Sequence, residues 1–187
     1  MKKMLKIILI VFLVLVIVGV TSIAVIVTDA AGNFATGSHA LPNGAAIGQA
    51  LVVYDPGLSG GAKDVATKIG YDLQTAGYNV MLAGVKSSVA SNTTSYNVIV
   101  VGGPIYAGSP ASSVQSYLNS LNPPENAKVG VFGFGSVKVD NTDSVAVLKD
   151  VASISSNSQL TINAAVKVVS GNNVDVNCQD FVTNLLK

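Results

Sequence analysis

Arginine and tryptophan are absent from this chain of 187 residues, and cysteine and histidine each occur once. With a single thiol, at Cys178, no disulfide can form within the chain. The absence of arginine also excludes a twin-arginine export signal. Because a metal site needs several converging ligands and a hydrolytic triad needs a positioned histidine, the lone His39 favours neither. We therefore expect no metal site, and no catalytic residue stands out.

Charged residues are also scarce, at 11% of the chain. Beyond the three lysines of the first six residues, eight lysines stand against ten acidic residues. Nucleic-acid binding needs a basic patch or stripe, and no such cluster occurs in the body of the chain. We therefore expect no nucleic-acid partner.

One long apolar run makes up much of the 49% hydrophobic content. Residues 7–27 contain no charge, and a helix of this length spans about 30 Å, the thickness of the hydrocarbon core of a bilayer. The run has no polar face, which argues against a helix of a soluble core. The alternative is a cleavable signal peptide, cut after Asp29 or near Ser38-His39-Ala40, but its apolar region would be shorter, about 7–15 residues.

The flanking charges predict how this segment lies in the membrane. Lys2, Lys3 and Lys6 precede it, and the first charge after it is Asp29. The positive-inside rule then predicts a single-pass protein of the cell membrane, with its N-terminus inside and the rest outside. We expect a short basic N-terminus over 1–6, a transmembrane helix over 7–27, a flexible glycine-punctuated linker over 28–49 and one domain over 50–187.

From residue 50 onward, short apolar runs alternate with segments of helical periodicity. The runs predict five strands, over 50–54, 79–85, 97–102, 128–134 and 162–169. The periodic segments predict helices over 62–73, 110–121, 145–151 and 176–186. Alternating strands and helices form a parallel sheet with right-handed crossovers, so the predicted class is a doubly wound α/β domain.

Three glycine-containing segments follow predicted strands: 55–62, 102–110 and 133–136. In a doubly wound sheet, ligands bind beyond the carboxyl ends of the strands. The first segment leads into a helix, where backbone N–H groups favour an anion. Tyr106 and Phe134, in the other two segments, each offer an aromatic face to a ligand or to the core.

Three segments of the sequence resemble the three loop-bearing segments of the flavodoxin family: LVVYD with its glycine turn, VIVVGGPIYAGSPASSVQSYL and KVGVFGFGS. This resemblance implies a five-stranded parallel sheet in the order 2-1-3-4-5 and FMN as the cofactor. It implies that the first loop holds the FMN phosphate and that the other two border the flavin ring. The implied cofactor-binding residues are Gly57, Leu58, Ser59, Gly60, Gly61 and Ala62 for the first loop, Pro104, Ile105, Tyr106, Ala107 and Gly108 for the second, and Gly133, Phe134 and Gly135 for the third.

Two functions of different classes follow. The resemblance implies a membrane-tethered, FMN-binding electron carrier or flavin-dependent oxidoreductase, with a redox protein or a quinone as its partner. The alternative is a cofactor-free binding or display domain at the cell surface. The first loop favours that alternative because it keeps one hydroxyl, that of Ser59, where family loops have several.

Overall fold

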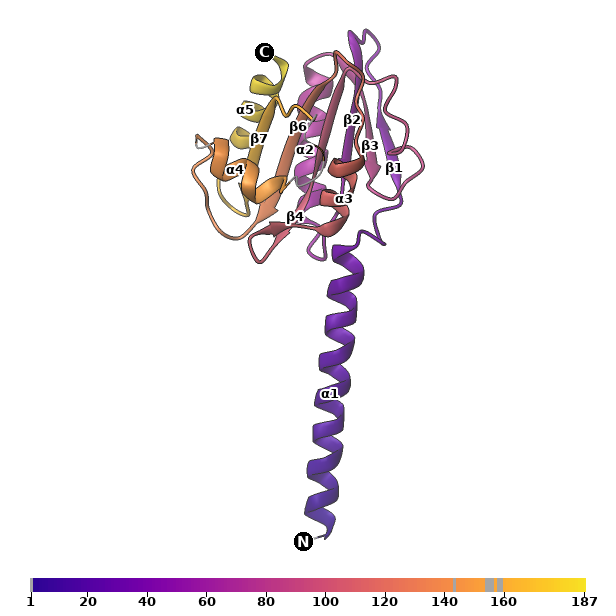
Figure 1. Cartoon of the computed structure of the whole chain (residues 1–187), viewed down its shortest axis with the longest axis vertical. Helices are drawn as coiled ribbons and strands as arrows, with labels where there is room; N and C mark the ends of the chain where they lie inside the picture. Colours follow the sequence, from indigo (N-terminus) through magenta and orange to yellow (C-terminus); the bar gives the residue numbers. More distant parts are fainter. Residues whose placement is uncertain (1, 143, 154–156, 158–159) are drawn as a thin grey trace.

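The computed structural model describes residues 2–142, 144–153, 157 and 160–187. A single long helix, α1 (Lys2–Ala30), extends as a rod away from an α/β domain that contains the rest of the chain (Figure 1). The side chains from Met4 to Val27 are exposed along it. Over the described residues, α1 is the one helix whose length and composition suit a membrane span.

Five parallel strands form the centre of the sheet: β2 (Gly48–Tyr54), β3 (Tyr78–Gly84), β4 (Val98–Tyr106), β6 (Lys128–Gly135) and β7 (Ala164–Val169). Their spatial order is β3-β2-β4-β6-β7. Numbered among the parallel strands alone, this is the predicted order 2-1-3-4-5. The three inner strands, β2, β4 and β6, are buried along most of their length, which explains the apolar runs of their sequences.

In the described part of the domain, four helices cover the two faces of this sheet. Helices α2 (Gly61–Thr75) and α5 (Val174–Leu186) lie on one face, while α3 (Ser112–Ser120) and α4 (Ser144–Val151) lie on the other. In α2 the buried side chains recur at helical spacing, so one stripe faces the sheet: Ala62, Val65, Ala66, Ile69 and Leu73. The predicted doubly wound class is confirmed.

The segment predicted to be a flexible linker is instead packed on the domain. Strand β1 (Ser38–Leu41) pairs antiparallel with β3 at the edge of the sheet. After it, the Asn43 amide nitrogen donates a 2.7 Å hydrogen bond to the side chain of Asn79. Before it, Ala35 is 3% exposed. The prediction of a free tether over 28–49 was therefore wrong, because backbone pairing and burial of a few small residues order the segment.

The predicted loop over 102–110 is also more ordered than expected. Strand β4 continues to Tyr106 and turns into β5 (Ser109–Pro110), which pairs with it antiparallel. The two turn residues have positive φ, 50° at Ala107 and 81° at Gly108. Two-residue hairpin turns favour this backbone because it matches the twist of the strands. The end of β4 and β5 thus form a β-hairpin at the carboxyl edge of the parallel sheet.

Candidate functional site

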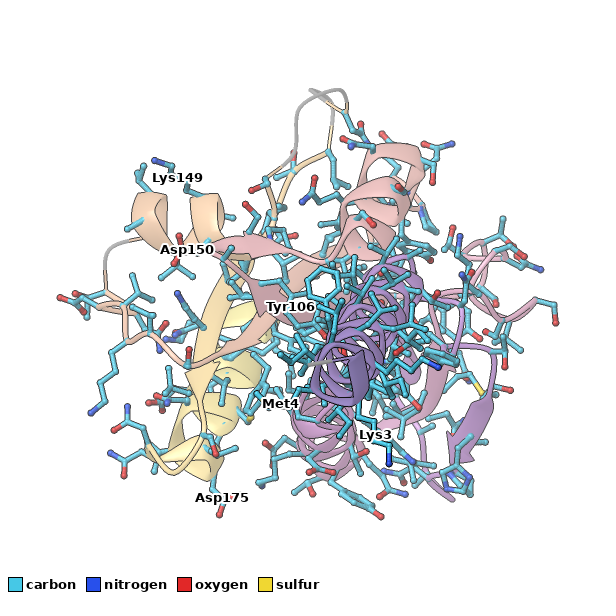
Figure 2. The ribbon with its side chains drawn as sticks, turned by 90° about the horizontal axis from the view of Figure 1, so that it is seen from below. Lys3, Met4, Tyr106, Lys149, Asp150 and Asp175 are labelled. Atoms are coloured by element: carbon cyan, nitrogen blue, oxygen red, sulfur yellow. The ribbon has the colours of Figure 1, made fainter. Side chains whose placement is uncertain are left out.

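The three glycine-containing segments lie together at the carboxyl edge of the sheet. In register, Tyr54 of β2 pairs with Gly102 of β4, and Gly102 pairs with Phe132 of β6. The chain therefore leaves β2 and β6 beside the base of the β4–β5 hairpin. Figure 2 views the molecule from this side, with α1 pointing toward the reader and Tyr106 close beside it.

The first loop, residues 55–60, forms a compact turn. The Asp55 carboxylate, on a residue that is 1% exposed, accepts a 3.0 Å hydrogen bond from the Gly57 amide. The Gly61 amide donates to the Ser59 hydroxyl at 3.3 Å. At the start of α2, Gly60 is left-handed with φ of 73° and provides no side-chain cap. Because the first amide bonded back into the helix is that of Asp64, the amides of Ala62 and Lys63 have no partner within the helix, and Ala62 is fully buried.

A hollow of about 440 Å³ adjoins this helix N-terminus. Its lining comes from the first loop, from α2 and from the β7–α5 connection, with Phe134 as its aromatic member; the other residues are Ser59, Gly61, Asp64, Val65, Ser170, Gly171 and Val174. The Phe134 ring lies directly over Gly61, where a Cβ would come within 2.2 Å of the ring carbon Cε1. Only glycine fits at position 61 in this arrangement.

Tyr106 lies on the other side of the sheet from Phe134. Its ring packs against the core cluster under α3 and α4, whereas Phe134 packs against the cluster under α2 and α5. The Tyr106 hydroxyl donates to the Asp29 carboxylate and accepts a 3.4 Å hydrogen bond from the Leu58 amide. Burial, followed by the hydrogen bond to Asp29, raises the pKa of Tyr106 to about 12. The two aromatic residues therefore do not flank one cleft.

A smaller hollow of about 130 Å³ separates the hairpin from the chain that follows β6. It is lined on one side by hairpin residues and on the other by the end of β6 and the residues after it: Ile105, Ala107 and Gly108, and Gly135, Ser136 and Val137. At its base lies Lys167, which is 5% exposed. The Lys167 ammonium donates to the Asp150 carboxylate at 2.5 Å, so a buried ion pair supports the hollow.

The predicted binding residues did not include four polar residues at this edge: Asp29, Asp55, Ser113 and Lys167. The Ser113 hydroxyl donates to the Asp55 carboxylate at 2.5 Å, beneath the end of α1. Burial raises the pKa of Asp55, although hydrogen bonds from Ser113 and Gly57 oppose the shift, and the charge of Asp29 adds to it. The contacts of Asp29 with Tyr106, of Asp55 with Ser113 and of Lys167 with Asp150 join residues far apart in the sequence, so no local pattern indicates them.

Groups of three or more histidine, cysteine or acidic side chains that would hold a metal ion do not occur in the described part of the chain. His39 lies exposed on β1, an outermost strand of the sheet, where it pairs with Leu82 of β3.

Comparisons with known proteins bear on the fold. A flavodoxin from Streptococcus pneumoniae TIGR4 matches with a TM-score of 0.51 and 15% sequence identity, over 74% of this chain and 97% of that one. An oxidised flavodoxin 2 from Bacillus cereus matches with a TM-score of 0.54 and 16% identity, over the same shares of the two chains. No protein-family model and no curated protein matches the sequence. The α/β part of the chain has the flavodoxin-like fold.

Proposed function

We propose that the protein is a membrane-tethered, flavodoxin-like electron carrier that binds FMN at the carboxyl edge of its sheet. Helix α1 anchors it, with the lysine-rich N-terminus inside and the domain outside the membrane. The observation that carries the proposal is the uncapped N-terminus of α2 beside the 440 Å³ hollow. A 15-residue helix whose N-terminus has no side-chain cap favours a bound phosphate.

The residues at this edge fit the phosphate end of FMN. The Lys63 amide and the Ser59 hydroxyl are the donors, and the exposed Lys63 ammonium lies in the same turn. Phe134 provides an apolar wall beside them. When bound, FMN would supply one- or two-electron redox chemistry, while the chain binds it, orients it and sets its electrostatic environment.

A second candidate is the cofactor-free binding domain. Two observations favour it: the Phe134 ring covers Gly61, and the Tyr106 hydroxyl is already bonded to Asp29 and Leu58. The hollow between the hairpin and the β6–α4 connection, at about 130 Å³, is also small for a tricyclic ring. Binding of the flavin ring therefore requires the hairpin to move.

Titration of FMN into the full chain in detergent micelles tests the proposal, with quenching of flavin fluorescence as the readout. The full chain is used because β1 and the end of α1 pack on the domain. We expect a dissociation constant of about 1 μM or lower, equivalent to about 8 kcal/mol. No binding at about 100 μM, which corresponds to less than roughly 5.5 kcal/mol, supports the cofactor-free domain instead.

A pair of variants at Gly60 locates the site. Gly60 has positive φ, and a Cβ there meets no atom within 4 Å. Asparagine and aspartate both tolerate this backbone, but only aspartate adds a negative charge where the phosphate would bind. We expect Gly60→Asp to abolish FMN binding and Gly60→Asn to retain it. Equal binding by both variants would show that FMN, if it binds, does so elsewhere.

A further inference from the structure

The apolar helix joins the domain through a fixed connection. Asp29, in the last turn of α1, is 2% exposed and accepts the hydrogen bond of Tyr106. One residue later, the Ala30 carbonyl accepts a 2.8 Å hydrogen bond from the Ser112 hydroxyl. Gly32 then packs so closely that a Cβ would lie 2.7 Å from that of Ser113. Since the helix end contacts the hairpin and α3, the domain cannot turn freely on α1.

The length of this connection fixes the height of the domain above the membrane. The apolar run ends at Val27, two residues before Asp29, which is about 3 Å along a helix axis. The headgroup layer on each side of a bilayer is about 5–7 Å thick, judged from the total and hydrocarbon thicknesses. If the apolar run fills the hydrocarbon core, the carboxyl edge of the sheet begins within the headgroups.

The side chains around the helix suit that environment. Three exposed apolar residues lie on separate segments of the same edge: Phe34 after α1, Leu58 in the first loop and Val137 after β6. They are 59%, 50% and 69% exposed. Lys63, Lys86 and Lys138 are exposed at this edge as well and can reach headgroup phosphates. Figure 2 views this edge with α1 at its centre.

We propose that the domain docks edge-on against the bilayer that α1 crosses, with Phe34, Leu58 and Val137 in the headgroup region. The inference rests on the membrane anchoring in the proposed function, but it needs no bound FMN. The occupant of this surface is the lipid itself. A molecule that reaches the carboxyl edge then arrives through the interfacial layer, so a partner dissolved in or embedded in the membrane has access that a soluble protein lacks.

Single-tryptophan variants of the full chain test the docking, because the chain has no tryptophan of its own. Phe34→Trp, Leu58→Trp and Val137→Trp are reconstituted separately into phosphatidylcholine vesicles, either unlabelled or brominated on the acyl chains. Ile47→Trp is the matched control, since Ile47 is 74% exposed but precedes β2 at the opposite edge. Phe12→Trp, within the apolar run, reports insertion of α1.

We expect bromine to quench most of the fluorescence of Phe12→Trp and a large part of that of the three edge variants. Ile47→Trp should keep its fluorescence. If the edge variants are quenched no more than Ile47→Trp while Phe12→Trp is quenched, the docking is overturned and the anchor stands. If Phe12→Trp is not quenched, the anchoring and the docking both fail. Neither result alters the separate FMN titration.

Discussion

The hydroxyl of Tyr106, at the end of β4, donates a hydrogen bond to the carboxylate of Asp29, in the last turn of α1. The two residues are 77 positions apart. The bond connects the apolar helix to the hairpin that borders the candidate site. Tyr106 also contacts the first loop through the Leu58 amide, so one side chain joins α1, the hairpin and the first loop.

Removing this bond is expected to weaken the domain. Tyr106→Phe leaves the buried Asp29 carboxylate without its donor, and an unsatisfied buried polar group costs about 1–3 kcal/mol. The free energy of unfolding, measured by urea titration of the full chain in micelles, should fall by that amount. Tyr71→Phe is the control, because Tyr71 is half exposed on α2. An equal effect of the two variants would contradict the role of Tyr106.

The contact between Gly61 and Phe134 predicts a steric effect. Gly61→Ala places a methyl group against the ring, and overpacking of this kind costs about 1–3 kcal/mol. Gly37→Ala is the control, since a Cβ at Gly37 meets no atom within 4 Å. Adding Phe134→Ala to Gly61→Ala should remove most of the Gly61→Ala penalty in a double-mutant cycle of unfolding free energies. Purely additive effects would mean that the ring does not cover Gly61.

The raised pKa of Asp55 predicts a pH dependence. A carboxyl group whose pKa is higher in the folded state favours folding when it is protonated. The free energy of unfolding therefore falls as the pH rises from about 3.8 through the folded pKa of Asp55. Asp55→Asn removes this titration and retains an acceptor for the Gly57 amide. We expect the stability of the wild type relative to Asp55→Asn to fall over that pH range, as measured by urea unfolding. A flat difference would refute the shift.

The buried ion pair under the hairpin predicts an asymmetry between its partners. The Lys167 side chain is 3% exposed and that of Asp150 is 28% exposed. Asp150→Asn leaves an unpaired buried ammonium, and breaking such a pair costs about 3–5 kcal/mol. Lys167→Met replaces the ammonium with an apolar chain of similar length and should cost less. If Lys167→Met lowers the free energy of unfolding more than Asp150→Asn does, the unpaired charge of Lys167 is not what makes breaking the ion pair costly.

The parallel strands could be predicted because most of them are apolar runs and a helical pattern follows four of the five, whereas their order was implied by the resemblance to the flavodoxin family. Strand β1 could not, since three of its four residues are exposed and its sequence, SHAL, has no apolar run. The hairpin was missed because Gly103 and Pro104 are typical of a loop, yet both continue β4. The contact between Asp29 and Tyr106 depends on tertiary packing, which no local spacing indicates.

The pairing of β1 with β3 has a consequence for proteolytic processing. A peptidase cutting at Ser38-His39-Ala40, as in the signal-peptide alternative, would have to pull an edge strand out of the sheet, since Ser38 to Leu41 are each paired with β3. A cut just after Asp29 would fall between the buried carboxylate of that residue and the Ala30 carbonyl bonded to Ser112. Once folded, the domain thus shields both positions, and its separation from α1 requires cleavage before folding or local unfolding first.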